Sequence, residues 1–158
     1  MVLNPNVLAA ESDVAAAVGT TLAAGNYKIY GLTVPQANFE SIINRTANDE
    51  QNLLGSSVYT SSDPLIGPAV VAFQIADSAY RITLAMPGYA AVYFASGVGD
   101  TRFDPSVLVT FMNAQATRFL TERDRAFRAL QAILVSDTGN AMIDTSQPGY
   151  SQPSAPIY

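Results

Sequence analysis

The chain of 158 residues contains no histidine and no cysteine, and only 13% of its residues are charged. It therefore offers no imidazole base, no thiolate nucleophile and no soft metal ligand, which argues against most classes of enzyme. We expect no catalytic, cofactor-binding or metal site. The net charge of −5 also argues against avid nucleic-acid binding, so we expect at most transient contact with nucleic acid.

The low charge content has a second implication. A typical soluble domain has about a quarter of its residues charged, so much of this surface must be neutral or apolar and suited to cover by other subunits. No apolar run approaches the roughly 18 to 20 residues of a membrane span. The longest candidate is interrupted at Pro68, Gln74, Asp77, Arg81 and Pro87. We also find no signal-peptide pattern, and we expect no membrane contact.

The N-terminal segment, residues 1–34, precedes the clearest helical pattern. Residues 5–24 are rich in alanine and favour a weak helix, which Gly25 and Asn26 would end. The alternation in Tyr27–Val34 predicts a short strand or hairpin element. We divide the remainder into a helical core domain, residues 35–140, and an extended C-terminal arm, residues 141–158.

The first main helix is predicted over residues 35–54. Thr33 and Gln36 form a capping-box pattern around Pro35, and Gly55 is a stop signal. Apolar and small residues recur at helical spacing between them. The members of this stripe are Phe39, Ile42, Ile43, Thr46, Ala47, Leu53 and Leu54.

A second helix is predicted over residues 64–86, after a polar loop at residues 55–62. Asp63 is suited to accept amide hydrogens of the first turn, and Pro64 has no amide hydrogen to satisfy. The pattern should end at Pro87 and Gly88. Residues 89–99 fit either a strand or a short helix, because periodicity does not distinguish the two.

The longest periodic segment predicts a third helix over residues 105–136, opened by Asp104-Pro105 and closed by Thr138-Gly139-Asn140. Its apolar stripe comprises Leu108, Met112, Ala116, Phe119, Leu120, Phe127, Leu130, Ile133 and Leu134. The sequence thus predicts a mainly α fold, a bundle of about three main helices.

Half of the eight basic residues lie in this third helix, at Arg118, Arg123, Arg125 and Arg128. One interpretation is a solvated face with intrahelical ion pairs such as Arg118–Glu122 and Asp124–Arg128, each worth only a few tenths of a kcal/mol. The alternative is an intersubunit or lumen-facing surface. On that hypothesis the assembly interface includes Arg118, Glu122, Arg125 and Arg128.

The C-terminal arm is rich in Ser, Gln and Pro, and its three prolines disfavour a helix. Two interpretations stay open: a disordered tail, or an arm that docks on a neighbouring subunit. A docking arm would use its apolar side chains as anchors. These are Met142, Ile143, Tyr150, Ile157 and Tyr158.

Several segments in order resemble the head–tail connector (adaptor) proteins of tailed bacteriophages. The segments are Thr33-Val-Pro-Gln-Ala-Asn-Phe-Glu-Ser-Ile-Ile43, Leu53-Leu-Gly55, Asp63-Pro-Leu65, Ala76-Asp-Ser-Ala-Tyr-Arg81 and Glu122-Arg-Asp-Arg-Ala-Phe-Arg-Ala-Leu130. The resemblance covers residues 33 to 136. It implies a ring-forming structural virion protein that joins the portal to the tail. It further implies a homo-oligomer that contacts portal, tail or neck proteins, located in the virion and assembled in the host cytoplasm.

A second resemblance competes with the first. Ala116-Thr-Arg118 followed by Ala126-Phe-Arg128 is similar to the long helix of rod-shaped plant virus coat proteins, which implies a self-assembling coat subunit. The chain lacks the tryptophans common in that family. A small enzyme or ligand-binding module is the third and least favoured hypothesis.

Overall fold

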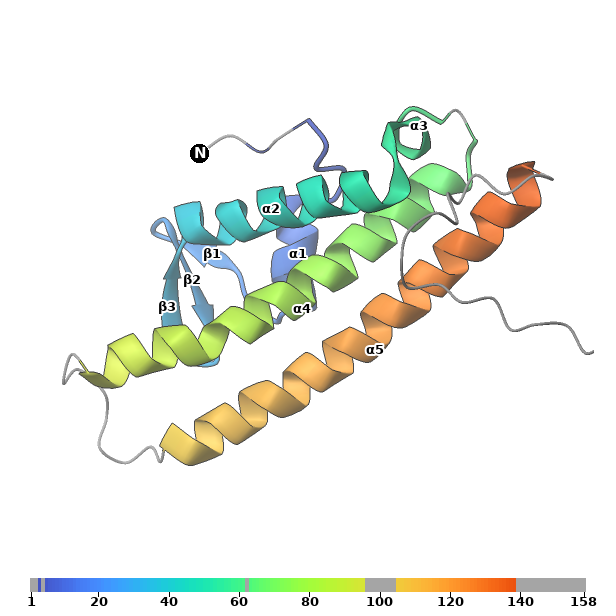
Figure 1. Cartoon of the computed structure of the whole chain (residues 1–158). Helices are drawn as coiled ribbons and strands as arrows, with labels where there is room; N and C mark the ends of the chain where they lie inside the picture. The colour runs from blue at the N-terminus through green and yellow to red at the C-terminus, as the bar shows by residue number, and fades with distance from the viewer. Residues whose placement is uncertain (1–2, 4, 62, 96–104, 139–158) are drawn as a thin grey trace, which may run out of the picture.

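The computed structural model describes residue 3 and residues 5–61, 63–95 and 105–138, and its described elements are mainly helical (Figure 1). The chain order is α1 (Glu11–Ala17), β1 (Leu22–Ala23), β2 (Asn26–Ile29), β3 (Leu32–Pro35), α2 (Gln36–Leu54), α3 (Ser56–Tyr59), α4 (Ile66–Ala95) and α5 (Pro105–Thr138). This confirms the predicted mainly α class. The predicted C-terminal arm, residues 141–158, lies outside the described residues.

The N-terminal sheet is antiparallel, with strand order β1-β2-β3. Of the two alternatives predicted for residues 27–34, a short strand or a hairpin element, the structure has the hairpin, because Tyr30 and Gly31 turn the chain with φ values of 53° and 82°. Tyr27 pairs with Val34 and both are buried, as the alternation requires. The weak helix predicted over residues 5–24 is shorter than expected, since only α1 is helical there.

Helix α2 confirms the helix predicted over residues 35–54, but the predicted capping box is wrong. Thr33 lies in β3, and Pro35 precedes the helix without any side-chain cap. The Gln36 side chain instead donates to the Glu11 carboxylate, tying α2 to α1. Gly55 ends the helix as predicted, with a φ of 83° that favours glycine.

Helix α4 is longer than predicted. The helix begins at Ile66, two residues later than predicted. The Asp63 carboxylate accepts the amide hydrogen of Leu65 at 2.7 Å, in the turn that leads into the helix. The predicted end at Pro87 is wrong, because the helix continues to Ala95 and absorbs part of the segment left open. An interior proline costs about 3 kcal/mol, and burial of Met86 and Ala90 on either side of Pro87 offsets this cost. The loop predicted over residues 55–62 contains the short helix α3.

Helix α5 runs antiparallel to α4 along nearly its whole length (Figure 1) and confirms the helix predicted over residues 105–136. The predicted stripe faces α4. Its most buried members are Met112, Ala116, Phe119, Leu130 and Leu134. The proposed start signal at Asp104 lies outside the described residues. No helix in the described part of the chain is both long and apolar enough to cross a membrane.

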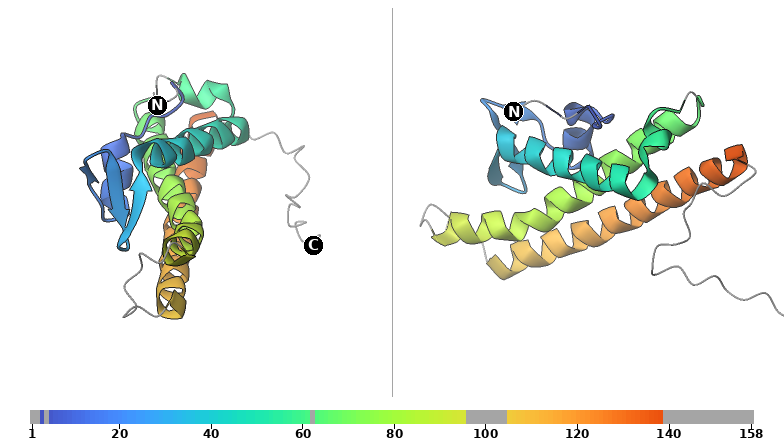
Figure 2. Two further views of the ribbon diagram at one scale, coloured as in Figure 1. Left: turned by 90° about the vertical axis from the view of Figure 1, so that its left-hand side faces the viewer. Right: turned by 45° about the horizontal axis from the view of Figure 1, so that its top comes forward.

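The apolar core has two clusters that lie towards opposite ends of α4. The larger joins the sheet and α1 to the helices, through side chains such as Val34, Phe39, Ile82 and Met112. The smaller joins α3, the start of α4 and the end of α5. Figure 2 shows that the sheet and α2 approach α4 from one side while α5 follows it on another. The outer side of α5 therefore faces solvent.

Candidate assembly surface and the buried polar layer

The structure places the four predicted interface residues of α5 together on its solvent-facing side. Arg118, Arg125 and Arg128 are exposed, and Glu122 is half-buried beside them. The Arg118 guanidinium donates to the Glu122 carboxylate at 2.9 Å, as the spacing predicted. The predicted tail anchors Met142, Ile143, Tyr150, Ile157 and Tyr158 lie outside the described residues.

A continuous row of exposed residues follows the outer side of α5, and we call it the outer ridge. Its residues are spaced alternately by four and three positions, the spacing that keeps side chains in line for contact with a neighbouring element. The outer ridge comprises Val107, Phe111, Ala114, Arg118, Thr121, Arg125, Arg128, Ala132 and Val135, all exposed. Its ends are apolar, with Val107 62% and Val135 57% exposed. Phe111 is 46% exposed, and its ring packs edge-on against that of Tyr30, 5.2 Å between ring centres.

The middle of the outer ridge is positively charged. Within the described residues, the structure records no ion pair for Arg125 or Arg128. The predicted Asp124–Arg128 pair is wrong, because Asp124 pairs instead with Arg123 at 3.3 Å. Two unpaired cations therefore face solvent in a chain whose net charge is −5.

Arg123 is the arginine of α5 that turns inward. It lies one helical turn after the buried Phe119 and reaches α4, where its guanidinium is 3.8 Å from the Asp77 carboxylate. It also lies over the Tyr80 ring, 5.5 Å from the ring centre. Arg123 is close in sequence to the other arginines, but its helical phase matches the apolar stripe, and this phase is the sequence signal that separates it from them.

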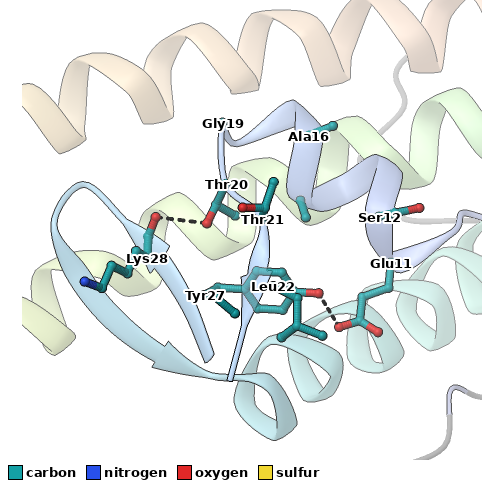
Figure 3. A pocket seen from close by; sticks show the side chains of 11 residues that line it. Glu11, Ser12, Ala16, Gly19, Thr20, Thr21, Leu22, Tyr27 and Lys28 are labelled. Carbon is teal, nitrogen blue, oxygen red and sulfur yellow. Dashed lines mark hydrogen bonds between the residues drawn. The ribbon is translucent and has the colours of Figure 1, made fainter. Parts of the chain in front are cut away.

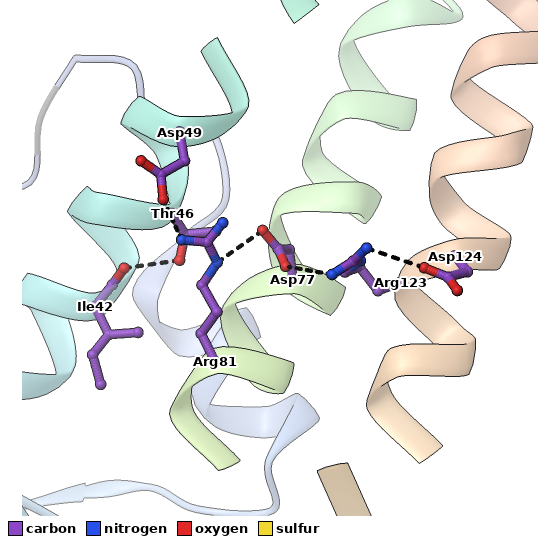
Figure 4. A network of polar contacts seen from close by, with 7 residues as sticks. All are labelled: Ile42, Thr46, Asp49, Asp77, Arg81, Arg123 and Asp124. Carbon is purple, nitrogen blue, oxygen red and sulfur yellow. Dashed lines mark hydrogen bonds and ion pairs between the residues drawn. The ribbon is translucent and has the colours of Figure 1, made fainter. Parts of the chain in front are cut away.

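Asp77 and Arg81 continue this contact into α4 and α2. The Arg81 guanidinium donates to Asp77 at 3.1 Å and also pairs with Asp49 of α2 (Figure 4). Asp77 is only 3% exposed. Burial raises the pKa of Asp77, while the positive charges of Arg81 and Arg123 oppose that effect. The chain Asp49–Arg81–Asp77–Arg123 thus connects three helices.

Glu50 of α2 completes a polar layer between the two apolar clusters, in which Glu50 and Asp77 are buried and the other members reach towards solvent. Glu50 is 2% exposed, and neither carboxylate oxygen has a hydrogen-bond partner at normal geometry, although the Gln74 amide lies near enough to favour the ionised form. Burial, reinforced by the negative charge of Asp77 and partly opposed by Arg81, raises the pKa of Glu50 to about 9. Glu50 is therefore protonated at neutral pH. We define the polar layer as Asp49, Glu50, Asp77, Arg81 and Arg123.

A shallow hollow of about 690 Å³ lies between α1 and the first two strands (Figure 3). The Tyr27 hydroxyl donates to the Glu11 carboxylate at 2.5 Å. Burial and the Glu11 carboxylate raise the pKa of Tyr27, so that the hydroxyl stays protonated. These two polar groups satisfy each other, and the Lys28 side chain also lines the hollow. In the described residues, no cluster of acidic side chains is arranged to hold a metal ion.

Comparison of the chain with protein-family models, curated proteins and solved structures found no match.

The raised pKa of Glu50 predicts how stability varies with pH. Between about pH 4.5 and pH 9 the folded chain keeps a proton on Glu50 that the unfolded chain releases, so this group makes the fold less stable as pH rises. Glu50→Gln should therefore stabilise the fold by at least about 1 kcal/mol at pH 8 and by little at pH 4. Urea unfolding across this range tests it. The exposed control Asp13→Asn should show no such trend, and equal pH profiles for wild type and Glu50→Gln would contradict the raised pKa of Glu50.

The inward contact of Arg123 predicts a contrast between two neighbouring arginines. Arg123→Ala should destabilise the fold by about 1–2 kcal/mol, because Asp77 stays buried with less compensation. Arg125→Ala, on the outer ridge, should change stability by less than about 0.5 kcal/mol. Thermal or urea unfolding of both variants measures the difference. Equal stabilities would show that Arg123 does not support the polar layer.

Proposed function

We propose that this chain is a structural virion protein, a ring-forming head–tail connector (adaptor) subunit of a tailed bacteriophage that joins the portal to the tail, and that it is not an enzyme. The observation that carries an assembly role is the outer ridge. Its apolar ends expose apolar surface to water in an isolated subunit, and its unpaired arginines offer positive charges that carboxylates of a partner can pair with. The proposed partners are further copies of the chain and the neighbouring virion proteins.

The charge of the outer ridge favours one kind of symmetry. Two outer ridges packed face to face would oppose arginines from both copies, and like charges across an interface are strongly unfavourable. The outer ridge should therefore meet a different surface of its neighbour. Contacts between unlike surfaces generate closed rings when the rotation closes and helical tubes when it does not.

The choice of a phage connector among virion proteins rests on the sequence resemblance over residues 33 to 136. Light scattering and negative-stain microscopy test the proposal, since a connector should form closed rings, alone or on portal assemblies. Open helical tubes would favour the rod-virus coat alternative. A chain that stays monomeric and also fails to join particles would contradict both assignments.

Charge reversal on the outer ridge should block assembly without unfolding the subunit. Arg125→Glu combined with Arg128→Glu replaces two positive charges with negative ones, which would face the negative charges of the proposed partner surface. Assembly should therefore be lost, while helicity measured by circular dichroism stays unchanged. The matched control reverses two exposed cations elsewhere, Lys28→Glu with Arg45→Glu, and should still assemble. Normal assembly of the outer-ridge variant would identify the arginines as a solvated face.

Removal of the C-terminal arm should separate folding from assembly. All described helices and strands end at or before Thr138, so deletion of residues 141–158 should preserve the helical signal and the unfolding midpoint. Incorporation into rings or particles should fall at least several-fold, measured by sedimentation of assembled material. Full incorporation of the truncated chain would show that the arm does not dock.

A further inference from the structure

The outer ridge is apolar at both ends and positively charged in the middle. Apolar Val135 and Ala132 lie at its C-terminal end, followed by a central stretch that contains three arginines, and then by Phe111 and Val107. The apolar ends, Val107 and Val135, are about 42 Å apart at a rise of about 1.5 Å per residue. An occupant of the outer ridge must therefore be long, apolar at both ends and negatively charged or aromatic in between.

The C-terminal arm of this chain has the same order. Met142 and Ile143 come first, Asp144 follows as the only charged side chain after Thr138, and Tyr150 comes next. Ile157 and Tyr158 form the second apolar end. The match has the right sign of charge. With Met142 placed on Val135, Asp144 falls about 6 Å along the ridge, one turn short of Arg128 at about 10 Å and within reach of its long side chain.

The lengths agree as well. The arm contains three prolines, which favour an extended conformation with a rise of about 3.1 Å per residue. Met142 and Ile157 would then be about 46 Å apart, close to the span of the outer ridge. With Met142 placed on Val135, Tyr150 falls about 25 Å along the ridge, level with Arg118, where a ring can stack on a guanidinium.

We propose that residues 141–158 of one subunit bind along the outer ridge of a second copy, with the arm running from Val135 towards Val107. This inference rests on the proposed assembly function. If the arm bound the outer ridge of its own subunit, neither the arm nor the outer ridge would be available to contact another subunit. Between copies, each subunit donates one arm and accepts one, which is a contact between unlike surfaces and satisfies the charge argument.

Complementation between two full-length variants tests this arrangement. The ridge variant carries Arg125→Glu and Arg128→Glu, and the arm variant carries Ile143→Ser, Ile157→Ser and Tyr158→Ser. Each variant alone should be monomeric by light scattering. An equimolar mixture should double in mass and grow no further, because the ridge variant keeps a functional arm and the arm variant keeps a functional ridge.

The outcomes separate this inference from the proposed function. If the wild type assembles but the mixture stays monomeric, or if the mixture forms full-size oligomers, the arm does not bind the outer ridge of a neighbour. A monomeric wild type that enters no particle overturns the assembly function as well. If circular dichroism shows that the ridge variant has lost helicity, Arg125→Gln with Arg128→Gln replaces it, with the same expected doubling in mass.

The absence of native cysteine allows a second, direct measurement. A full-length chain with Asp144→Cys and Arg128→Cys should form disulfide-linked dimers and larger species under mild oxidation. The control combines Asp144→Cys with Asn48→Cys, an exposed position on α2, and should stay largely uncrosslinked. A monomer with an internal disulfide would show that the arm binds its own helix, which overturns the exchange between subunits.

Discussion

The burial of Asp77 between two apolar clusters is the constraint on which the arrangement of the helices depends. A carboxylate that is 3% exposed requires compensation, and Arg81 of α4 and Arg123 of α5 supply it. Apolar burial is non-directional, whereas the contact between Arg123 and Asp77 is specific to one turn of each helix. A shift of α5 would separate Arg123 from Asp77. The polar layer therefore fixes which turn of α5 faces which turn of α4.

The same constraint decides which arginines remain outside. Once Arg123 points towards α4, the helical repeat turns Arg118, Arg125 and Arg128 to the opposite side. The contact of Arg123 with Asp77 and the outer ridge thus lie on opposite faces of α5, and one rotation of the helix about its axis sets both. An interface that depends on charge register requires such a setting, because rotation of α5 by one residue would carry the outer arginines away from a partner's carboxylates.

Local signals in the sequence predicted the helices well, since Asp63, Gly55 and the stripe from Met112 to Leu134 act within one element. The end of α4 was not predictable in this way, because packing of Met86 and Ala90 against other elements overcomes the local effect of Pro87. In the sequence, Asp77 and Arg81 interrupt an apolar run. Charged residues on a buried stripe of a helix nevertheless indicate that oppositely charged side chains on other helices pair with them. Those partners, Asp49 and Arg123, are distant in sequence, so only the fold identifies them.

Because the helices have few charged residues, each ionised side chain has a more specific structural role than a charged residue on a typical protein surface. α4 contains only Asp77 and Arg81 as charged residues, and both belong to the polar layer. The arginines of α5 divide between that layer, which takes Arg123, and the outer ridge, which takes the other three. Because few other charges are present, a partner bound in a shifted register would form no alternative ion pairs. The free energies of binding in the correct and in a shifted register should therefore differ strongly. A chain with a neutral surface and a few well-placed charges is thereby suited to associate in one register.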